Sequence, residues 1–145
     1  MHYHIYCNTK SIRTHHLRAI TEYEKRLSSY CTTCLQLTTS LPPAREFAGE
    51  NHSFIRIGSE GATQSSYDFA QSLDSIQQSG RSHVHIFIGY TEAECMDRLS
   101  MQTAFQKPQN LCLTHSRLSF ETQTLLFYEQ LYRGYTILQG KTYHK

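Results

Sequence analysis

Short apolar segments alternate with amphipathic ones along this chain, and this alternation constrains the fold more than any other feature. Apolar, β-branched and aromatic residues predict strands at residues 2–7, 34–37, 54–57, 84–88 and 111–114. Apolar residues at helical spacing predict helices that begin near Thr14, Ser66, Thr91 and Phe120. Strands that alternate with helices are typical of an α/β fold, in which a mainly parallel sheet is flanked by helices.

Turn residues between these segments place the loops. Residues 40–53 have the composition of a loop, and Gly58 and Gly89 each end a predicted strand. Thr14 is expected to cap the first helix, and Ser65 or Ser66 the second. Because the carboxyl ends of parallel strands share one edge, the loops after Ile57, Gly89 and Thr114 are predicted to form one rim that holds any ligand site.

Length and charge set broad limits on the class of protein. The 145 residues suit a single domain, residues 1–145, and the net charge of +2 does not by itself indicate nucleic-acid binding. The cations are nevertheless concentrated in the first 26 residues and at the C-terminus. No apolar run is long enough for a membrane span and no signal peptide is evident, so a soluble, cytoplasmic protein is expected.

Several residue clusters have both a structural and a functional interpretation. Cys31 and Cys34 have the spacing of half a zinc site, but no second pair accompanies them, and the nine histidines lack partnering acids; we therefore predict no metal site. Gly89 could bring backbone close to a ligand, or serve only the turn. The aromatic and basic C-terminus could stack on RNA bases and neutralise phosphate, or simply pack as a docked tail.

The two ends of the chain resemble a known family. The segment Glu129-Gln130-Leu131-Tyr132-Arg133-Gly134, followed by Tyr143-His144-Lys145, is similar to the EQ-x-YRA…YHK signature of the RlmH family, ribosomal RNA methyltransferases of the SPOUT class. Glu22-Tyr23-Glu24-Lys25-Arg26-Leu27 matches the family's EY-x-KRL. The resemblance implies an α/β fold with a deep C-terminal trefoil knot. It also implies a homodimer that uses S-adenosylmethionine to methylate N3 of a pseudouridine in 23S rRNA of the assembled ribosome.

The resemblance also implies roles for individual residues. Three C-terminal residues would act next to the target ring as catalytic groups: Arg133, Tyr143 and His144. The cofactor would contact the ends of the strands and the loop before the last helix: Ile57, Gly89, Leu113, Thr114, His115, Ser116, Arg117 and Leu118. Basic residues would face the RNA: Lys10, Arg13, Arg18, Lys25, Arg26 and Lys145.

Two stretches depart from the family pattern. Where the family has GG-x-x-G, this chain has Tyr90 and Ala93 at the positions of the second and third glycines. It also has Ser119-Phe120 where the family has a Pro-His pair. Tyr90 would add a large side chain where the backbone is expected to approach the cofactor. These changes leave a second hypothesis open, in which the chain is a knotted homologue that binds RNA or the ribosome without transferring a methyl group.

Overall fold

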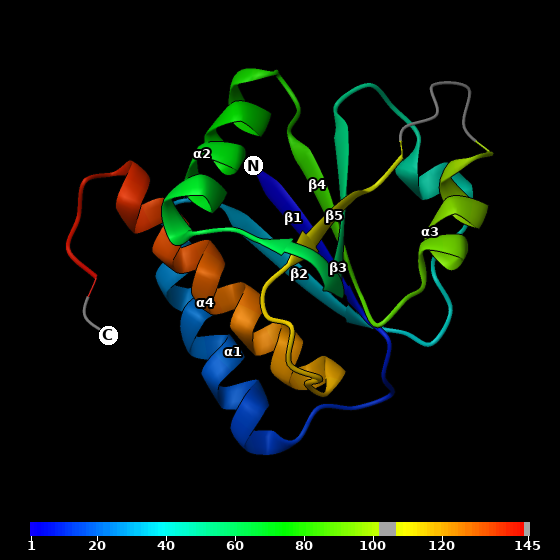
Figure 1. Cartoon of the computed structure of the whole chain (residues 1–145), viewed down its shortest axis with the longest axis horizontal. Helices are drawn as coiled ribbons and strands as arrows, with labels where there is room; N and C mark the ends of the chain where they lie inside the picture. The colour runs from blue at the N-terminus through cyan, green and yellow to red at the C-terminus, as the bar shows by residue number, and fades with distance from the viewer. Residues whose placement is uncertain (102–106, 144–145) are drawn as a thin grey trace.

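The computed structural model describes residues 1–101 and 107–143, and within them the strands form one parallel sheet (Figure 1). The strands are β1 (His2–Cys7), β2 (Thr32–Leu37), β3 (His52–Thr63), β4 (His83–Ile88) and β5 (Gln109–Cys112). Their order is β2-β1-β4-β3-β5, and every neighbouring pair is parallel. The predicted α/β architecture is confirmed.

Helices cover both faces of this sheet. The larger helices α1 (Thr14–Leu27), α2 (Ser66–Gln78) and α4 (Phe120–Leu138) lie on one face, and α3 (Glu92–Leu99) lies on the other with the 3₁₀ turn η1 (Ala44–Phe47) (Figure 1). Ser65 caps α2 as predicted, because its side chain accepts a hydrogen bond from the Asp68 backbone. Thr91 and Glu94 form a capping box on α3.

Period-two alternation in the strands builds a separate core on each face. On β4, Val84 and Ile86 point toward α1, α2 and α4 and join the larger core. Phe87 points the other way and packs with Phe47 of η1 and Leu99 of α3 in the smaller core. Each face of the central strands is therefore buried, at least along the carboxyl half of the sheet.

Three local predictions are wrong. The segment 40–53 is not only a loop, since η1 forms there and buries the Phe47 ring against the sheet. β3 does not end at Gly58 but continues to Thr63 after a register shift against β5. Thr14 does not cap α1: the helix begins there, and the exposed Arg13 backbone N–H is instead satisfied by the Glu121 carboxylate of α4.

The order and pairing of strands do not trace how the chain threads past itself, so the trefoil knot remains a prediction. The single-domain organisation likewise remains an expectation. Within the described residues, no helix is both long and apolar enough to cross a bilayer.

Five histidines form a continuous cluster on the face that carries α3. His2 and His4 of β1 pair in register with His83 and His85 of β4, and His52 of β3 stacks against both β4 rings. Hydrogen bonds join His4 Nε2 to His83 Nδ1 at 3.0 Å and His52 Nδ1 to His85 Nε2 at 2.8 Å. The expectation that His83 and His85 share one strand face is confirmed. No group of metal-ligating side chains in the described residues is arranged to hold a metal ion.

This cluster predicts that the fold loses stability in mild acid. Burial, and then the neighbouring imidazoles, lower the pKa of His85 to about 2, and the pKa values of His4 and His52 are lowered for the same reason. A histidine whose folded pKa lies below its unfolded value of about 6.5 stabilises the fold above pH 6.5, and that stability is lost as the pH falls. At pH 5 the buried His85 alone is expected to cost about 2 kcal/mol.

Urea unfolding midpoints at pH 7, 6 and 5 measure this loss. His85→Phe removes the titrating group in a site already lined by aromatic rings, and it should flatten the pH dependence even though two hydrogen bonds are lost. The matched control is His15→Gln, which removes an exposed histidine outside the cluster. If the urea midpoint of His85→Phe falls with pH as steeply as that of the unmodified chain, His85 is not the group that causes the loss of stability in acid.

Candidate active site

One face of α4 lines a row of three cavities, which we call the α4 groove. The α4 residues that line it lie three or four positions apart, as one helix face requires, with Thr136 and Ile137 adjacent at its end: Gln123, Leu126, Gln130, Arg133, Thr136 and Ile137. We call them the loop cavity, which includes Thr114 and Ser116, the middle cavity, which includes Gln64, and the tail cavity, which includes Tyr143. The loop cavity and the middle cavity share Leu113 and Leu126. The middle cavity and the tail cavity share Ser65 and Ser66. The three spaces are therefore contiguous along the helix.

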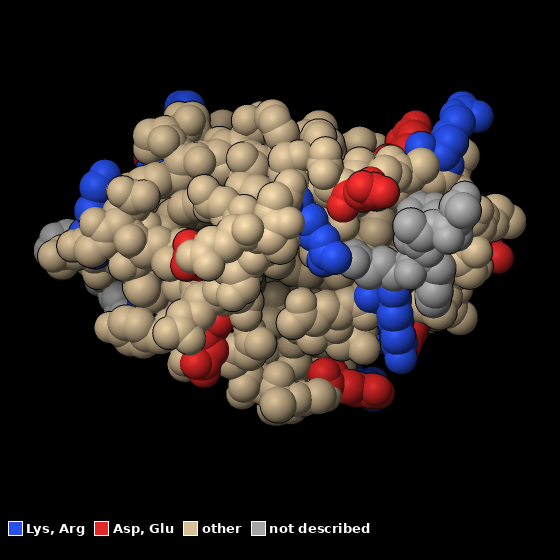
Figure 2. Space-filling view, turned by 90° about the horizontal axis from the view of Figure 1, so that it is seen from above, with Lys and Arg blue, Asp and Glu red and all other residues tan. Residues whose placement is uncertain are grey.

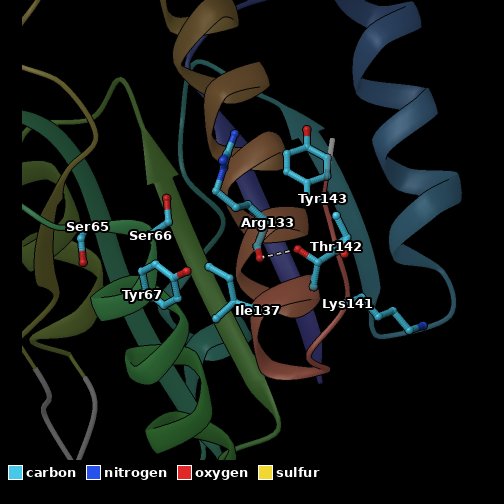
Figure 3. Close-up of a pocket in the computed structure, with 9 residues that line it drawn as sticks. Ser65, Ser66, Tyr67, Arg133, Ile137, Lys141, Thr142 and Tyr143 are labelled. Atoms are coloured by element: carbon cyan, nitrogen blue, oxygen red, sulfur yellow. Dashed lines mark hydrogen bonds between the residues drawn. The ribbon is translucent and has the colours of Figure 1, made fainter. Parts of the chain in front are cut away.

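The tail cavity is the largest of the three, at about 500 Å³, within the usual range of small-molecule sites. It lies between the start of α2, the last turns of α4 and the C-terminal tail. Figure 3 shows Tyr67 and Tyr143 on opposite sides of it, with Ile137 and Arg133 between them. Two of the residues predicted to be catalytic, Arg133 and Tyr143, therefore line one cavity. His144 and Lys145 lie outside the described residues.

Arg133 is held in place from two sides. Its Nε atom donates to Glu129 Oε1 at 3.0 Å, an i,i+4 contact on α4, and both side chains are 18% exposed. Its guanidinium lies 4.8 Å from the centroid of the Tyr143 ring. The Tyr143 hydroxyl in turn hydrogen-bonds Tyr23 of α1 at 3.1 Å. The tail is thus fixed against α1 and α4 by aromatic and cation–π contacts.

The phenol of Tyr143 stays protonated at neutral pH. Burial, followed by the hydrogen bond with Tyr23 and the charge of Glu129, raises its pKa well above the usual value of 10. Arg133 opposes this effect only in part. Tyr143 therefore presents a neutral hydroxyl that can donate a hydrogen bond to a ligand.

The middle cavity, of about 240 Å³, has walls of two kinds. Apolar side chains from three elements form one part: Phe69, Leu111, Leu113 and Leu126. Hydroxyl and amide side chains form the other part: Gln64, Ser65, Ser66 and Gln130. Ser66 Oγ donates to Gln130 Oε1 at 3.3 Å, and this contact joins α2 to α4 where the middle and tail cavities meet.

The loop cavity gathers half of the residues that were predicted to contact the cofactor. Ile57, Leu113, Thr114 and Ser116 all line it, although the space among them is only about 10 Å³. Gly89, His115, Arg117 and Leu118 do not line it. The exposed His115 instead donates to the Ser59 carbonyl at 3.1 Å, which joins the β5 loop to β3.

Gly89 follows β4 in a backbone conformation that favours glycine, with φ of +89°. A Cβ placed there would lie 2.8 Å from the Phe120 ring and 2.9 Å from the Cβ of Asn8. Asn8 also donates to the Gly89 carbonyl at 2.8 Å. A glycine is therefore required here because the Phe120 ring approaches the backbone closely. Phe120 stands where the family pattern has histidine.

Tyr90 does not crowd the groove, contrary to expectation. Its side chain is buried on the opposite face of the sheet, in the smaller core with Phe87 and Cys95, and its hydroxyl donates to the Thr38 carbonyl. Ala93 is exposed on α3. Both departures from the family's glycine pattern thus point away from the cavities.

Five of the basic side chains expected to face RNA lie in the described residues, and these five are exposed: Lys10, Arg13, Arg18, Lys25 and Arg26. Two of them are occupied by acids, since Arg13 pairs with Glu121 and Arg26 with Glu22. Arg26 also lies 5.9 Å from the centre of the Tyr132 ring. On the face seen in Figure 2, basic and acidic side chains are interspersed and no field of a single sign forms.

Comparison with known proteins decides the family. A family model described as "Predicted SPOUT methyltransferase" matches residues 1–144. The chain belongs to the SPOUT methyltransferase family. "Ribosomal RNA large subunit methyltransferase H" of Bacillus cytotoxicus is 30% identical over 150 residues, covering 88% of this chain and 89% of the relative. "Ribosomal RNA large subunit methyltransferase H 1" of Thermoanaerobacter sp. (strain X514) is 26% identical and covers all of both chains. The protein from Leuconostoc mesenteroides is 29% identical over 147 residues.

Several groove residues of this SPOUT methyltransferase were not among the predicted site residues. They come from the two residues before α2, the start of α2 and one face of α4: Gln64, Ser65, Ser66, Tyr67, Phe69, Gln123, Gln130, Thr136 and Ile137. The α4 members carry a signal that could have been used, since their three- and four-residue spacing runs through Arg133. The α2 members carry none, because only the packing of α2 beside α4 brings them to the groove.

Proposed function

We propose that this chain transfers a methyl group from S-adenosylmethionine to N3 of a pseudouridine in large-subunit ribosomal RNA. The family match from residue 1 to 144 carries this proposal. The relatives that cover nearly the whole chain bear the name of a large-subunit ribosomal RNA methyltransferase. The α4 groove adds support, because its tail cavity contains two residues of the C-terminal signature beside a second cavity with mixed walls.

The middle cavity suits the parts of S-adenosylmethionine. Leu111, Leu113 and Leu126 offer apolar contact for an adenine ring, and Gln64 and Gln130 offer partners for hydroxyl and amino-acid groups. Thr114 and Ser116 extend these polar partners into the loop cavity. The bound cofactor supplies an electrophilic methyl group on a sulfonium. The chain itself contributes binding and alignment at near-attack distance.

In the tail cavity the chain must hold the acceptor ring and accommodate the loss of its N3 proton. Arg133, fixed by Glu129, offers a cation that stabilises negative charge on the deprotonated ring. Tyr143 offers a neutral hydroxyl donor. His144 stays in this proposal as the group that accepts the proton, and Lys145 as an RNA contact.

We propose further that the protein acts as a knotted homodimer in the cytoplasm. The exposed cations of the first helix and the turn before it would face RNA: Lys10, Arg13, Arg18, Lys25 and Arg26. Two copies would bring the net charge of the pair to twice the +2 of one chain. Because the contact between Arg26 and Glu22 is exposed on both sides, phosphate can displace that carboxylate at little cost.

A second function, RNA binding without methyl transfer, is favoured by two observations. Phe120 covers Gly89, and the space among Ile57, Leu113, Thr114 and Ser116 is very small. Calorimetry with S-adenosylmethionine separates the two functions. The enzyme should bind in the micromolar range, whereas a protein that only binds RNA should show no heat of binding at millimolar cofactor.

Mass spectrometry of ribosomal RNA then tests the acceptor. Ribosomes from a strain lacking the gene should carry an unmethylated pseudouridine, and the purified protein with S-adenosylmethionine should add 14 Da to the oligonucleotide that contains it, the mass that a methyl group adds when it replaces hydrogen. Arg133→Ala serves as the inactive control. Cofactor binding without this mass change would direct the search to another RNA.

A further inference from the structure

We propose that the tail cavity binds a single unpaired nucleotide of RNA and that Tyr67 is the side chain on which its base stacks. This inference rests on the proposed function, because it identifies where the acceptor nucleotide is held. Enzymes that modify a base take it out of the helical stack and receive it in a pocket. Such a pocket needs a flat apolar surface, a group for the phosphate and polar partners for the base edge.

Tyr67 provides the flat surface. It is the second residue of α2 and is 70% exposed, so its ring is accessible to a ligand. It nevertheless lines the tail cavity, opposite Tyr143 in Figure 3. Stacking on an aromatic side chain is how proteins hold unpaired bases, since every base has a π-face.

Lys141 provides for the phosphate. The residues that line the tail cavity include the cations Arg133 and Lys141, and among these described residues there is no carboxylate. Arg133 is paired with Glu129 and is the cation proposed for the acceptor ring. The Lys141 ammonium contacts the neutral Tyr30 hydroxyl at 3.1 Å, so its positive charge is available to a phosphate.

The position of the cavity also fits an acceptor. Ser65 and Ser66 line both the tail cavity and the middle cavity, so a ring held against Tyr67 would lie next to the space proposed for the methyl donor. Hydroxyl groups of Ser66 and Thr142 line the same space and can bond the polar edge of a base. A volume of about 500 Å³ is ample for one nucleotide.

The test uses uridine 5′-monophosphate as the probe and NMR of the full chain as the readout. Tyr67→Ala should weaken binding of the nucleotide by roughly 5-fold or more, because a stacked base contributes about 1–3 kcal/mol. Tyr67→Phe keeps the ring and should stay within about twofold of the unmodified chain. Uridine without phosphate should bind more weakly than the monophosphate.

Met101→Ala is the matched control, since Met101 is 73% exposed and does not line the groove. Equal affinity of Tyr67→Ala and the unmodified chain for the nucleotide would overturn the inference. Displacement of the nucleotide by S-adenosylmethionine would also overturn it, because the cavity would then belong to the cofactor. If the chain fails to bind cofactor while Tyr67 still governs nucleotide binding, the proposed methyl transfer fails and this site stands.

Discussion

Arg133→Ala should lower the rate of RNA methylation by about 10²- to 10³-fold while leaving the fold intact. The loss follows from removing a fixed cation next to the ring that becomes negatively charged, which is the usual cost of deleting one preorganised donor. Stability should change little. The lost contacts are an i,i+4 ion pair and a cation–π contact with Tyr143, each contributing no more than about 1 kcal/mol.

Comparison of two further variants isolates the geometry of this side chain. Arg133→Lys keeps the charge but not the planar fork, so its activity should fall between that of Arg133→Ala and the unmodified chain. Arg45→Ala removes an exposed cation from η1 on the opposite face of the sheet and should leave activity unchanged. Single-turnover methylation with saturating S-adenosylmethionine is the measurement. If the methylation rate of Arg133→Ala stays within about threefold of that of the unmodified chain, Arg133 has no role in the mechanism.

The sequence predicted most of the fold because its signals are local. All five predicted strands form, and the Ser65 cap and the start of α4 at Phe120 agree with the pattern. The errors occur where distant residues decide the outcome. Arg13, not Thr14, precedes α1 because a carboxylate from α4 binds its backbone N–H. Likewise, η1 forms within 40–53 because Phe47 finds aromatic partners on β1 and β4.

The candidate site was predictable only in part, for a related reason. Motif residues on α4 and the β5 loop lie at fixed spacings, and Arg133, Leu113 and Thr114 do line the α4 groove. Tyr67 was out of reach, since its place in the groove depends on how α2 packs against α4. The prediction for Tyr90 failed because its place in the motif does not show to which face of the sheet the side chain turns.

Gly89→Ala should destabilise the fold by about 2–5 kcal/mol. Two costs combine. A side chain at φ of +89° costs about 1–2 kcal/mol, and a Cβ within 2.8 Å of the Phe120 ring adds an overpacking cost of about 1–3 kcal/mol. Asn8 blocks relief from the other side, with its Cβ only 2.9 Å away. Urea unfolding at pH 7 measures the change.

Gly80→Ala separates these two costs, because Gly80 has a φ of +82° but nothing within 4 Å of its added Cβ. It should lose only the conformational part. The double variant Gly89→Ala with Phe120→Ala should recover some of the packing loss, since one of the two obstacles is gone. Equal destabilisation by Gly89→Ala and Gly80→Ala would mean that the Phe120 ring yields readily. Phe120 would then be free to move off Gly89 when a cofactor binds. If Gly89→Ala instead destabilises the fold more than Gly80→Ala does, the Phe120 ring is held rigidly against Gly89.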